Sequence, residues 1–156
     1  MSKRIAFICI GNMCRSQMAE GLARHLGGEN LVVESAGTHP TGQVSPAAVT
    51  AMSELGIDIS QQLSKGIPEI DLAAADVIVS MAPEPAHSLA PGGFEGSLLD
   101  WDVPDPIGYP VEIFRFVLQD ILHRVEGLLA ELGVEYVPLP AVGGSGEGDE
   151  EKNRPG

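Results

Sequence analysis

The chain alternates between short apolar runs and stretches whose apolar residues recur at helical spacing. Such alternation is typical of a parallel sheet whose strands are connected by helices. It predicts an α/β fold, a single-domain three-layer α/β/α sandwich with a four-stranded parallel sheet. The proline-rich stretch 83–91 is predicted to be a loop. Strands are predicted at residues 3–9, 30–35, 77–81 and, more weakly, 97–100, and helices at residues 16–26, 45–55, 71–75 and 111–132.

The composition changes near the end of the chain. A length of 156 residues, of which 44% are hydrophobic, suits one domain with its own core. Beyond Leu139 the chain consists mainly of Gly, Glu, Asp, Ser and Pro. Such a segment cannot bury enough apolar area to offset the entropy of ordering it. We therefore predict a folded domain over residues 1–138 and a flexible, acidic, glycine-rich tail over residues 139–156.

The charge balance limits the partners of the protein. The formal net charge is −13, whereas nucleic acids and anionic membranes are polyanions that require clusters of Lys and Arg. No apolar run approaches the length of a membrane span, and the run 5–10 is too short for a signal-peptide core. The two cysteines, Cys9 and Cys14, provide no disulfide framework, which favours the reducing cytoplasm. An anionic substrate would have to be held by local amides and a few placed cations.

One segment combines the features of a nucleophile and an anion site. It joins the first predicted strand to the first predicted helix, and five residues separate a cysteine at its start from an arginine at its end. A loop that enters a helix points several unpaired backbone N–H groups into one concavity, where the helix dipole adds positive potential. A phosphate-shaped anion fits there without a net positive charge on the protein. The residues are Cys9, Ile10, Gly11, Asn12, Met13, Cys14 and Arg15.

The residue types in this loop suit that chemistry. The amides and the dipole would stabilise the thiolate of Cys9 as a nucleophile, and Arg15 would clamp two oxygens of the anion. Gly11 permits a tight loop, and Asn12 tolerates a left-handed backbone and can tie the loop together through its side chain. The alternative is structural: Cys9 would be a buried residue that ends a strand, and Arg15 a surface cation.

This loop resembles that of the low-molecular-weight protein tyrosine phosphatase superfamily, which includes a branch of arsenate reductases. In that superfamily the loop lies near the N-terminus and has the form Cys-x-Gly-Asn-x-Cys-Arg-Ser. The resemblance runs from Lys3 to about Gly133. Further matching segments are Glu34-Ser35-Ala36-Gly37-Thr38, Gly56-Ile57-Asp58-Ile59, Ala75-Asp76-Val77-Ile78-Val79 and Asp105-Pro106.

The resemblance implies catalytic roles for three residues. Cys9 would be the nucleophile, and Arg15 would bind the anion. Asp105 would protonate the leaving oxygen as a general acid and then act as a base on the water that completes the cycle. Asp105 could instead be a turn residue in front of Pro106. The phosphate would be bound by the loop residues Ile10, Gly11, Asn12, Met13, Cys14 and Arg15.

Supporting roles follow from the same resemblance. Asn12, Ser16 and Ser35 are similar to a hydrogen-bonded set that holds the loop and stabilises the thiolate, although Ser16 could also be a helix cap. Cys14 could form a reversible disulfide with Cys9 that protects the nucleophile, or it could be a packing residue. No cofactor is implied. No metal is expected either, because the four histidines show no paired ligand spacing.

Two reactions fit this loop: hydrolysis of a phosphate monoester and reduction of arsenate. Gln17 and Trp101 are similar to residues of the reductase branch. Thioredoxin-coupled reductases, however, use further cysteines soon after the third strand, and residues 81–88 contain none. The sequence therefore favours a phosphatase that hydrolyses phosphate monoesters through a cysteinyl-phosphate intermediate. Its substrate would be foremost phosphotyrosine in a phosphorylated protein, and otherwise a small phosphate ester. The alternative is an arsenate reductase that uses an external thiol partner.

The substrate of a phosphatase is left open by the sequence. Typical tyrosine phosphatases carry aromatic residues directly after the Asp-Pro pair, whereas here Ile107 and Gly108 come first and Tyr109 later. The related protein-arginine phosphatases have a similar Asp-Pro-x-Gly segment but a small Thr in the loop, where this chain has the bulkier Met13. A phosphoprotein-binding pseudo-phosphatase is a minor alternative, which turnover of an aryl phosphate would exclude.

Overall fold

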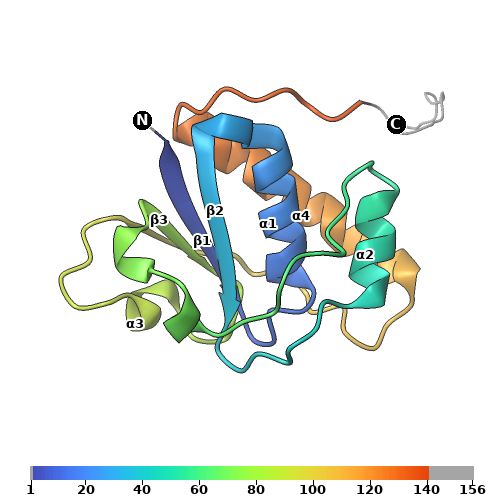
Figure 1. Ribbon diagram of the computed structural model, residues 1–156, viewed down its shortest axis with the longest axis horizontal. Helices are drawn as coiled ribbons and strands as arrows, with labels where there is room; N and C mark the ends of the chain where they lie inside the picture. The colour runs from blue at the N-terminus through green and yellow to red at the C-terminus, as the bar shows by residue number, and fades with distance from the viewer. Residues whose placement is uncertain (1, 141–156) are drawn as a thin grey trace.

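Four parallel strands form a single sheet in the order β2-β1-β3-β4 within residues 2–140, the part of the chain that the computed structural model describes (Figure 1). All carboxyl ends meet at one edge, where Cys9 pairs with Gly37 and Ile8 with Ser80. The predicted four-stranded α/β fold is confirmed. Most of the predicted tail, residues 141–156, lies outside the described residues. The strands are β1 (Lys3–Cys9), β2 (Leu31–Gly37), β3 (Val77–Ser80) and β4 (Ser97–Asp100).

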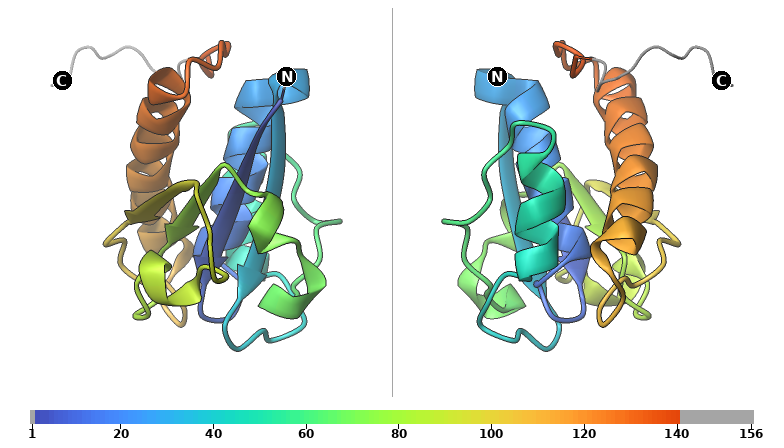
Figure 2. Two further views of the ribbon diagram at one scale, coloured as in Figure 1. Left: turned by 90° about the vertical axis from the view of Figure 1, so that its left-hand side faces the viewer. Right: turned by 90° about the vertical axis from the view of Figure 1, so that its right-hand side faces the viewer.

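Helices cover both faces of the sheet, as predicted, but unequally. The longer helices, α1 (Arg15–Gly27), α2 (Pro46–Ser53) and α4 (Val111–Glu131), pack together over one face. Figure 2 shows α4 running alongside α1 in both side views. The other face is covered by shorter pieces, α3 (Ala86–Leu89) and the 3₁₀ helices η2 (Ile67–Glu69) and η3 (Leu72–Ala74). A further 3₁₀ helix, η1 (Gly28–Asn30), connects α1 to β2.

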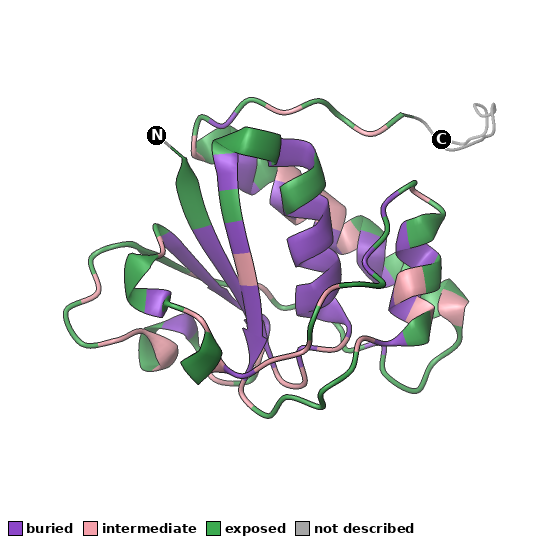
Figure 3. Cartoon of the chain, in the orientation of Figure 1, coloured by how far each residue is buried: buried purple, intermediate pink, exposed green. Residues whose placement is uncertain are grey.

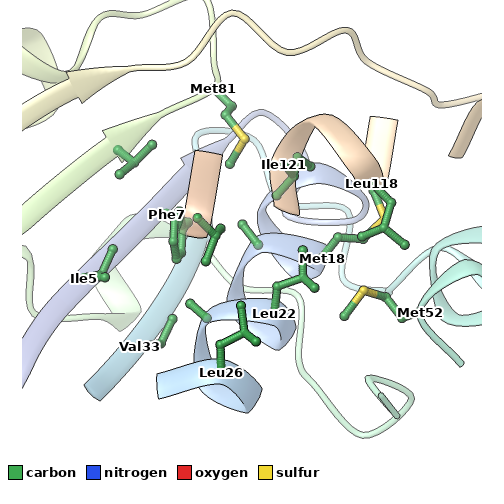
Figure 4. Packing of buried hydrophobic residues seen from close by; sticks show 14 of the residues in the cluster. Ile5, Phe7, Met18, Leu22, Leu26, Val33, Met52, Met81, Leu118 and Ile121 are labelled. Atoms are coloured by element: carbon green, nitrogen blue, oxygen red, sulfur yellow. The ribbon is translucent and has the colours of Figure 1, made fainter. Parts of the chain in front are cut away.

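The core follows from the alternation of side chains along β1. Successive side chains of a strand point to opposite faces, so Phe7 joins the cluster beneath the long helices, whereas Ile8 joins the cluster beneath the short ones. In the larger cluster Phe7, Met18 and Leu118 are fully buried (Figure 4). The buried residues of α4 recur at helical spacing, as the sequence predicts. Among the described residues no helix is both long and apolar enough to cross a membrane.

Several short elements differ from the prediction. The stretch 83–91, predicted to be a loop, contains α3, and the helix predicted at residues 71–75 is the three-residue η3. The 3₁₀ helices η1 and η2 are absent from the prediction. Elements of three or four residues complete little more than one turn, so no apolar periodicity develops that could mark them. The prediction is therefore wrong where tertiary packing alone selects a single turn.

Candidate active site

The candidate loop lies at the carboxyl edge of the sheet, between β1 and α1. Cys9 ends β1 and is only 3% exposed. Gly37 of β2 stands opposite, and a Cβ atom there would lie 2.5 Å from the carbonyl oxygen of Ile10 and 2.9 Å from the backbone nitrogen of Asn12. The loop therefore packs directly on the backbone of β2, a close approach that only glycine permits.

The carbonyl groups of the loop are hydrogen-bonded from outside by segment 38–45. Within residues 2–140, by contrast, no backbone N–H group of residues 10–15 donates a hydrogen bond to a protein acceptor. These N–H groups are available to an anion, as the loop sequence predicts. The outer bonds are Thr38 N to Cys9 O at 3.0 Å, His39 N to Ile10 O at 2.7 Å, Thr41 N to Gly11 O at 3.0 Å and Ser45 N to Met13 O at 2.9 Å.

The loop turns at Asn12 rather than at Gly11. Asn12 has φ = 49°, the left-handed conformation that asparagine tolerates better than most residues. Gly11 has no positive φ, and a Cβ atom there would lie 3.1 Å from Cγ2 of Thr41. The expected role of Asn12 thus agrees with the geometry. Gly11 instead makes room for Thr41.

Buried side chains connect this turn to the cysteine. Asn12 Nδ2 donates to Ser16 Oγ at 2.8 Å and to Ser35 Oγ at 2.9 Å. Ser16 Oγ lies 2.8 Å from the sulfur of Cys9. Ser16 makes no capping hydrogen bond, and the N-cap position of α1 belongs to Cys14. Of the two roles considered for Ser16, the structure supports the contact with Cys9 and not the cap.

Arg15 is fixed in orientation before any anion binds. It begins α1, and its Nη1 donates to the carbonyl oxygens of Met81 at 2.8 Å and Val103 at 3.0 Å. These carbonyls follow β3 and β4, so the sheet edge itself positions the guanidinium. Nη2 lies 3.6 Å from Oδ2 of Asp105. A planar guanidinium held along one edge can present its remaining N–H groups to an anion without further ordering.

The position of Asp105 is compatible with both roles that the sequence allows, a turn residue and a proton donor. Its Oδ1 accepts a hydrogen bond from the backbone N–H of Ile107 at 3.1 Å, which is a turn-forming contact. Its Oδ2 faces Arg15, and its side chain is 41% exposed at the entrance to the site. A carboxyl group at the entrance can exchange protons with solvent and with an atom bound above Cys9, as a general acid must.

Cys14 is a neutral, buried thiol. Neither cysteine is in a disulfide, and Cys14 is 4% exposed. Burial raises the pKa of Cys14 from 9.0 to about 12. A hydrogen bond from Ser45 lowers this pKa, the charges of Asp105 and Cys9 raise it, and the charge of Arg15 lowers it. The proposed redox role of Cys14 remains a prediction.

These residues surround a cavity of about 180 Å³. It contains most of the predicted site residues, while Asn12, Ser16 and Ser35 lie behind its wall. His39 and Thr41 also line the cavity, and the sequence analysis did not predict either as a site residue. Their position just after a strand that ends beside the loop could have indicated them. A larger pocket of about 570 Å³, between α1 and segment 56–65, does not include Cys9. The lining residues are Cys9, Ile10, Gly11, Met13, Cys14, Arg15, His39, Thr41, Asp105 and Ile107.

The fold and this site define a family of cysteine-dependent enzymes. A family model described as low molecular weight phosphotyrosine protein phosphatase matches residues 4–137. The chain therefore belongs to this family. Within residues 2–140, no cluster of three or more His, Cys, Asp or Glu side chains is arranged to hold a metal ion.

Similar proteins carry two kinds of name. The glutaredoxin arsenate reductase of Synechocystis sp. is 37% identical over 130 residues, which cover 83% of this chain and 98% of that protein. An arsenate reductase solved in the phosphate-binding state is 36% identical, with a TM-score of 0.71, covering 83% of this chain and 98% of that one. A low molecular weight protein tyrosine phosphatase from T. tengcongensis is 29% identical, with a TM-score of 0.72, covering 83% and 99% of the two chains.

Proposed function

We propose that this protein is an arsenate reductase in which Cys9 attacks arsenate and a thiol of another molecule completes the reduction. The observation that carries the proposal is the 37% identity to a glutaredoxin arsenate reductase over nearly its whole length. The low molecular weight protein tyrosine phosphatase of T. tengcongensis is less similar, at 29% identity. This proposal reverses the order in which the sequence ranks the two reactions.

The first step forms a bond between Cys9 and arsenic. Arsenate would lie in the loop, with its oxygens on the free N–H groups of residues 10–15 and on Arg15. The thiolate of Cys9 attacks arsenic, and one arsenate oxygen leaves. Asp105 supplies a proton to that oxygen, so that water departs rather than hydroxide. Arsenic is still in the pentavalent state at this stage.

The second step requires an electron donor from outside the chain. An incoming thiolate attacks the sulfur of Cys9, a disulfide bond forms, and the arsenic–sulfur bond breaks with its electron pair passing to arsenic. Arsenite leaves, and a second external thiol reduces the mixed disulfide to restore Cys9. One arsenate and two thiols thus give one arsenite, one disulfide and one water. Cys14 is an unsuitable internal donor because it is buried and its pKa is about 12.

Phosphate monoester hydrolysis is the second candidate function. It is favoured by the position of Asp105, which faces Arg15 at the entrance of the cavity and could serve both the leaving oxygen and the attacking water. This reaction needs only Cys9, Arg15, Asp105 and water. Its substrate would be a phosphorylated protein or a small phosphate ester, with Ile107 lining the cavity and the exposed side chain of Tyr109 two residues further along the chain.

One experiment separates the two reactions. The purified protein is incubated with arsenate, glutathione, glutaredoxin, glutathione reductase and NADPH, and formation of glutathione disulfide is followed through the arsenate-dependent consumption of NADPH. In parallel, hydrolysis of an aryl phosphate is measured without any thiol. We expect arsenate-dependent oxidation that is absent in Cys9→Ser. Rapid aryl phosphate hydrolysis with no arsenate-dependent oxidation by glutaredoxin, thioredoxin or glutathione alone would contradict the proposal and favour the phosphatase.

A further inference from the structure

The second step of the proposed reduction releases a proton that needs an acceptor. An external thiol has to lose its hydrogen when its sulfur attacks Cys9, because the thiolate is the nucleophile in thiol–disulfide exchange. At neutral pH most of an ordinary thiol is still protonated, since its pKa is about 8.5. A base at the entrance of the cavity would remove this proton as the thiol arrives.

Five titratable or charged side chains line the cavity, and four of them are unsuitable as this base. Cys9 is bonded to arsenic at this stage, and the guanidinium of Arg15 has no lone pair to accept a proton. Cys14 already carries its proton, with a pKa of about 12. Asp105 is a carboxyl group 3.6 Å from Arg15, and an ordinary carboxylate is a far weaker base than imidazole. The five residues are Cys9, Cys14, Arg15, His39 and Asp105.

His39 is positioned by the segment that follows β2. Its backbone N–H donates to the carbonyl oxygen of Ile10 at 2.7 Å, and that of Thr38 donates to the carbonyl oxygen of Cys9 at 3.0 Å. The segment is therefore bound to the loop directly beside the nucleophile. Figure 3 shows that this segment, residues 38–44, is mostly exposed. His39 thus lines the cavity and also faces the solvent from which a thiol arrives.

One ring nitrogen of His39 has a partner, and the other does not. Nδ1 lies 3.1 Å from Oγ1 of Thr38, whereas no hydrogen bond within residues 2–140 involves Nε2. In the tautomer that has its hydrogen on Nδ1, this nitrogen donates to Thr38, and Nε2 carries the lone pair that can accept a proton. Histidine is the side chain whose charge ordinarily changes between pH 5 and 8, so it suits proton transfer near neutral pH.

We propose that His39 is the catalytic base that takes the proton of the external thiol as the thiol sulfur attacks Cys9. The hydrogen passes to Nε2 of His39, and the thiol sulfur forms a disulfide bond with the sulfur of Cys9. The arsenic–sulfur bond breaks, and its electron pair reduces arsenic to the trivalent state. His39 then releases the proton to solvent. The inference deepens the proposed function and rests on it, because only that function requires a thiol from another molecule.

The test replaces arsenic with a chromophore, so it can be carried out without arsenate reduction. In a Cys14→Ser background, dithiobis(nitrobenzoate) converts Cys9 into its mixed disulfide with thionitrobenzoate. An added thiol attacks the sulfur of Cys9, because thionitrobenzoate is the better leaving group. Its release is followed by absorbance. The bond that forms is the same as in the second step, and thionitrobenzoate leaves with the electron pair in place of arsenic.

Two small thiols of similar size distinguish a base from a binding group. At pH 8 mercaptoethanol is mostly protonated, whereas trifluoroethanethiol, whose fluorines draw electrons from the sulfur, is mostly ionised. We expect His39→Gln to slow release by mercaptoethanol about tenfold and release by trifluoroethanethiol less than about twofold. The loss stays below the roughly 10²–10⁴-fold effect typical of a general base, because the ionised fraction of mercaptoethanol still reacts.

A matched control and a competing base complete the design. His123→Gln should leave both rates unchanged, because His123 is an exposed histidine of α4 that does not line the cavity. Equal losses with the two thiols in His39→Gln would overturn the inference, since a changed loop shape or weaker thiol binding affects both. Unchanged rates would overturn it as well. A thiol-selective loss in Asp105→Asn instead of His39→Gln would make Asp105 the base.

The result can be separated from that of the proposed function. A thiol-selective loss in a protein that cannot reduce arsenate would contradict the reductase but support His39 as a base for thiol attack. If the reagent does not label Cys9, arsenate-dependent oxidation of the same two thiols provides the comparison. A loss that is equal for both thiols in that assay again rejects the inference.

Discussion

Replacing Cys14 with serine tests whether the second cysteine takes part in arsenate reduction. The side chain is 4% exposed, and burial raises its pKa from 9.0 to about 12. At pH 8 a cysteine with an ordinary pKa of 9.0 is about one-tenth in the thiolate form. With a pKa of about 12, only about one molecule in ten thousand is in the thiolate form. The attacking population is therefore about a thousandfold smaller, and Cys14 should be a poor resolving thiol.

We therefore expect Cys14→Ser to reduce arsenate within about twofold of the parent rate when glutaredoxin and glutathione are supplied, since a residue outside the chemistry changes the barrier little. The rate is followed through arsenate-dependent NADPH consumption, with Cys9→Ser as the inactive control. The reasoning is refuted if Cys14→Ser loses reduction while its Cys9 is alkylated at the parent rate. Cys14 would then be the resolving thiol, and its burial would have to be relieved during turnover.

The burial of Cys14 also makes stability depend on pH. Because its folded pKa of about 12 lies above the ordinary 9.0, the folded state holds this proton more tightly than the unfolded chain does. This contribution is complete below pH 9 and is lost as the pH rises toward 12. Between pH 9 and pH 12 the free energy of unfolding should therefore fall with rising pH in the parent more steeply than in Cys14→Ser. The difference between the two slopes should be about 1.4 kcal/mol per pH unit. Urea unfolding of both proteins from pH 8 to pH 10.5 measures this, and equal slopes would contradict it.

Three further substitutions test the site and the core. Cys9→Ser should abolish turnover but keep thermal stabilisation by inorganic phosphate; loss of that stabilisation would mean the loop has changed shape. If the protein hydrolyses esters, Asp105→Asn should slow poor leaving groups by about 10²–10⁴-fold and activated aryl phosphates much less, whereas equal losses would make Asp105 structural. Gly21→Ala, whose Cβ would lie 2.6 Å from Cγ2 of Ile59, should lower the free energy of unfolding by about 1–3 kcal/mol in urea titrations, and no loss would mean that the neighbours yield freely.

The long elements could be predicted because their patterns extend over several repeats. The apolar run of β1 and the helical spacing of α4 each contain enough positions to define a period, and both lie where predicted. The four residues of α3 are too few to define a period, and the sequence predicts a loop there instead of a helix. Its first backbone N–H, that of Ala86, binds the side chain of Asp100, so a contact distant in sequence helps to form it.

The catalytic candidates and the loop-holding residues Asn12, Ser16 and Ser35 could be identified from the sequence, but two further polar residues behind the loop could not. Cys9 and Arg15 belong to one short motif, and Asp105 was placed by family resemblance. Gln17 and Glu20 instead lie in a helix whose early turns are buried on nearly all sides. An amphipathic pattern assumes that polar residues face water, so it assigns both to the solvent side. Only the tertiary structure shows that Gln17 donates hydrogen bonds to the carbonyl oxygens of Asn12 and Leu63 and that Glu20 accepts one from Ser35.

The choice between reduction and hydrolysis could not follow from the motif, because both reactions begin with the same arrangement. Each needs a nucleophile, a group that binds the anion and a proton donor around one tetrahedral oxyanion, and in our proposal Cys9, Arg15 and Asp105 would supply these to either substrate. The reactions diverge at the second step, in which water or a thiol arrives. In the proposed reductase, the burial of Cys14 means that the thiol would come from another molecule, and the identity of that molecule is not encoded in the loop. What the chain can encode is access to Cys9, so residues at the cavity entrance such as His39 and Ile107 are where the two functions should differ.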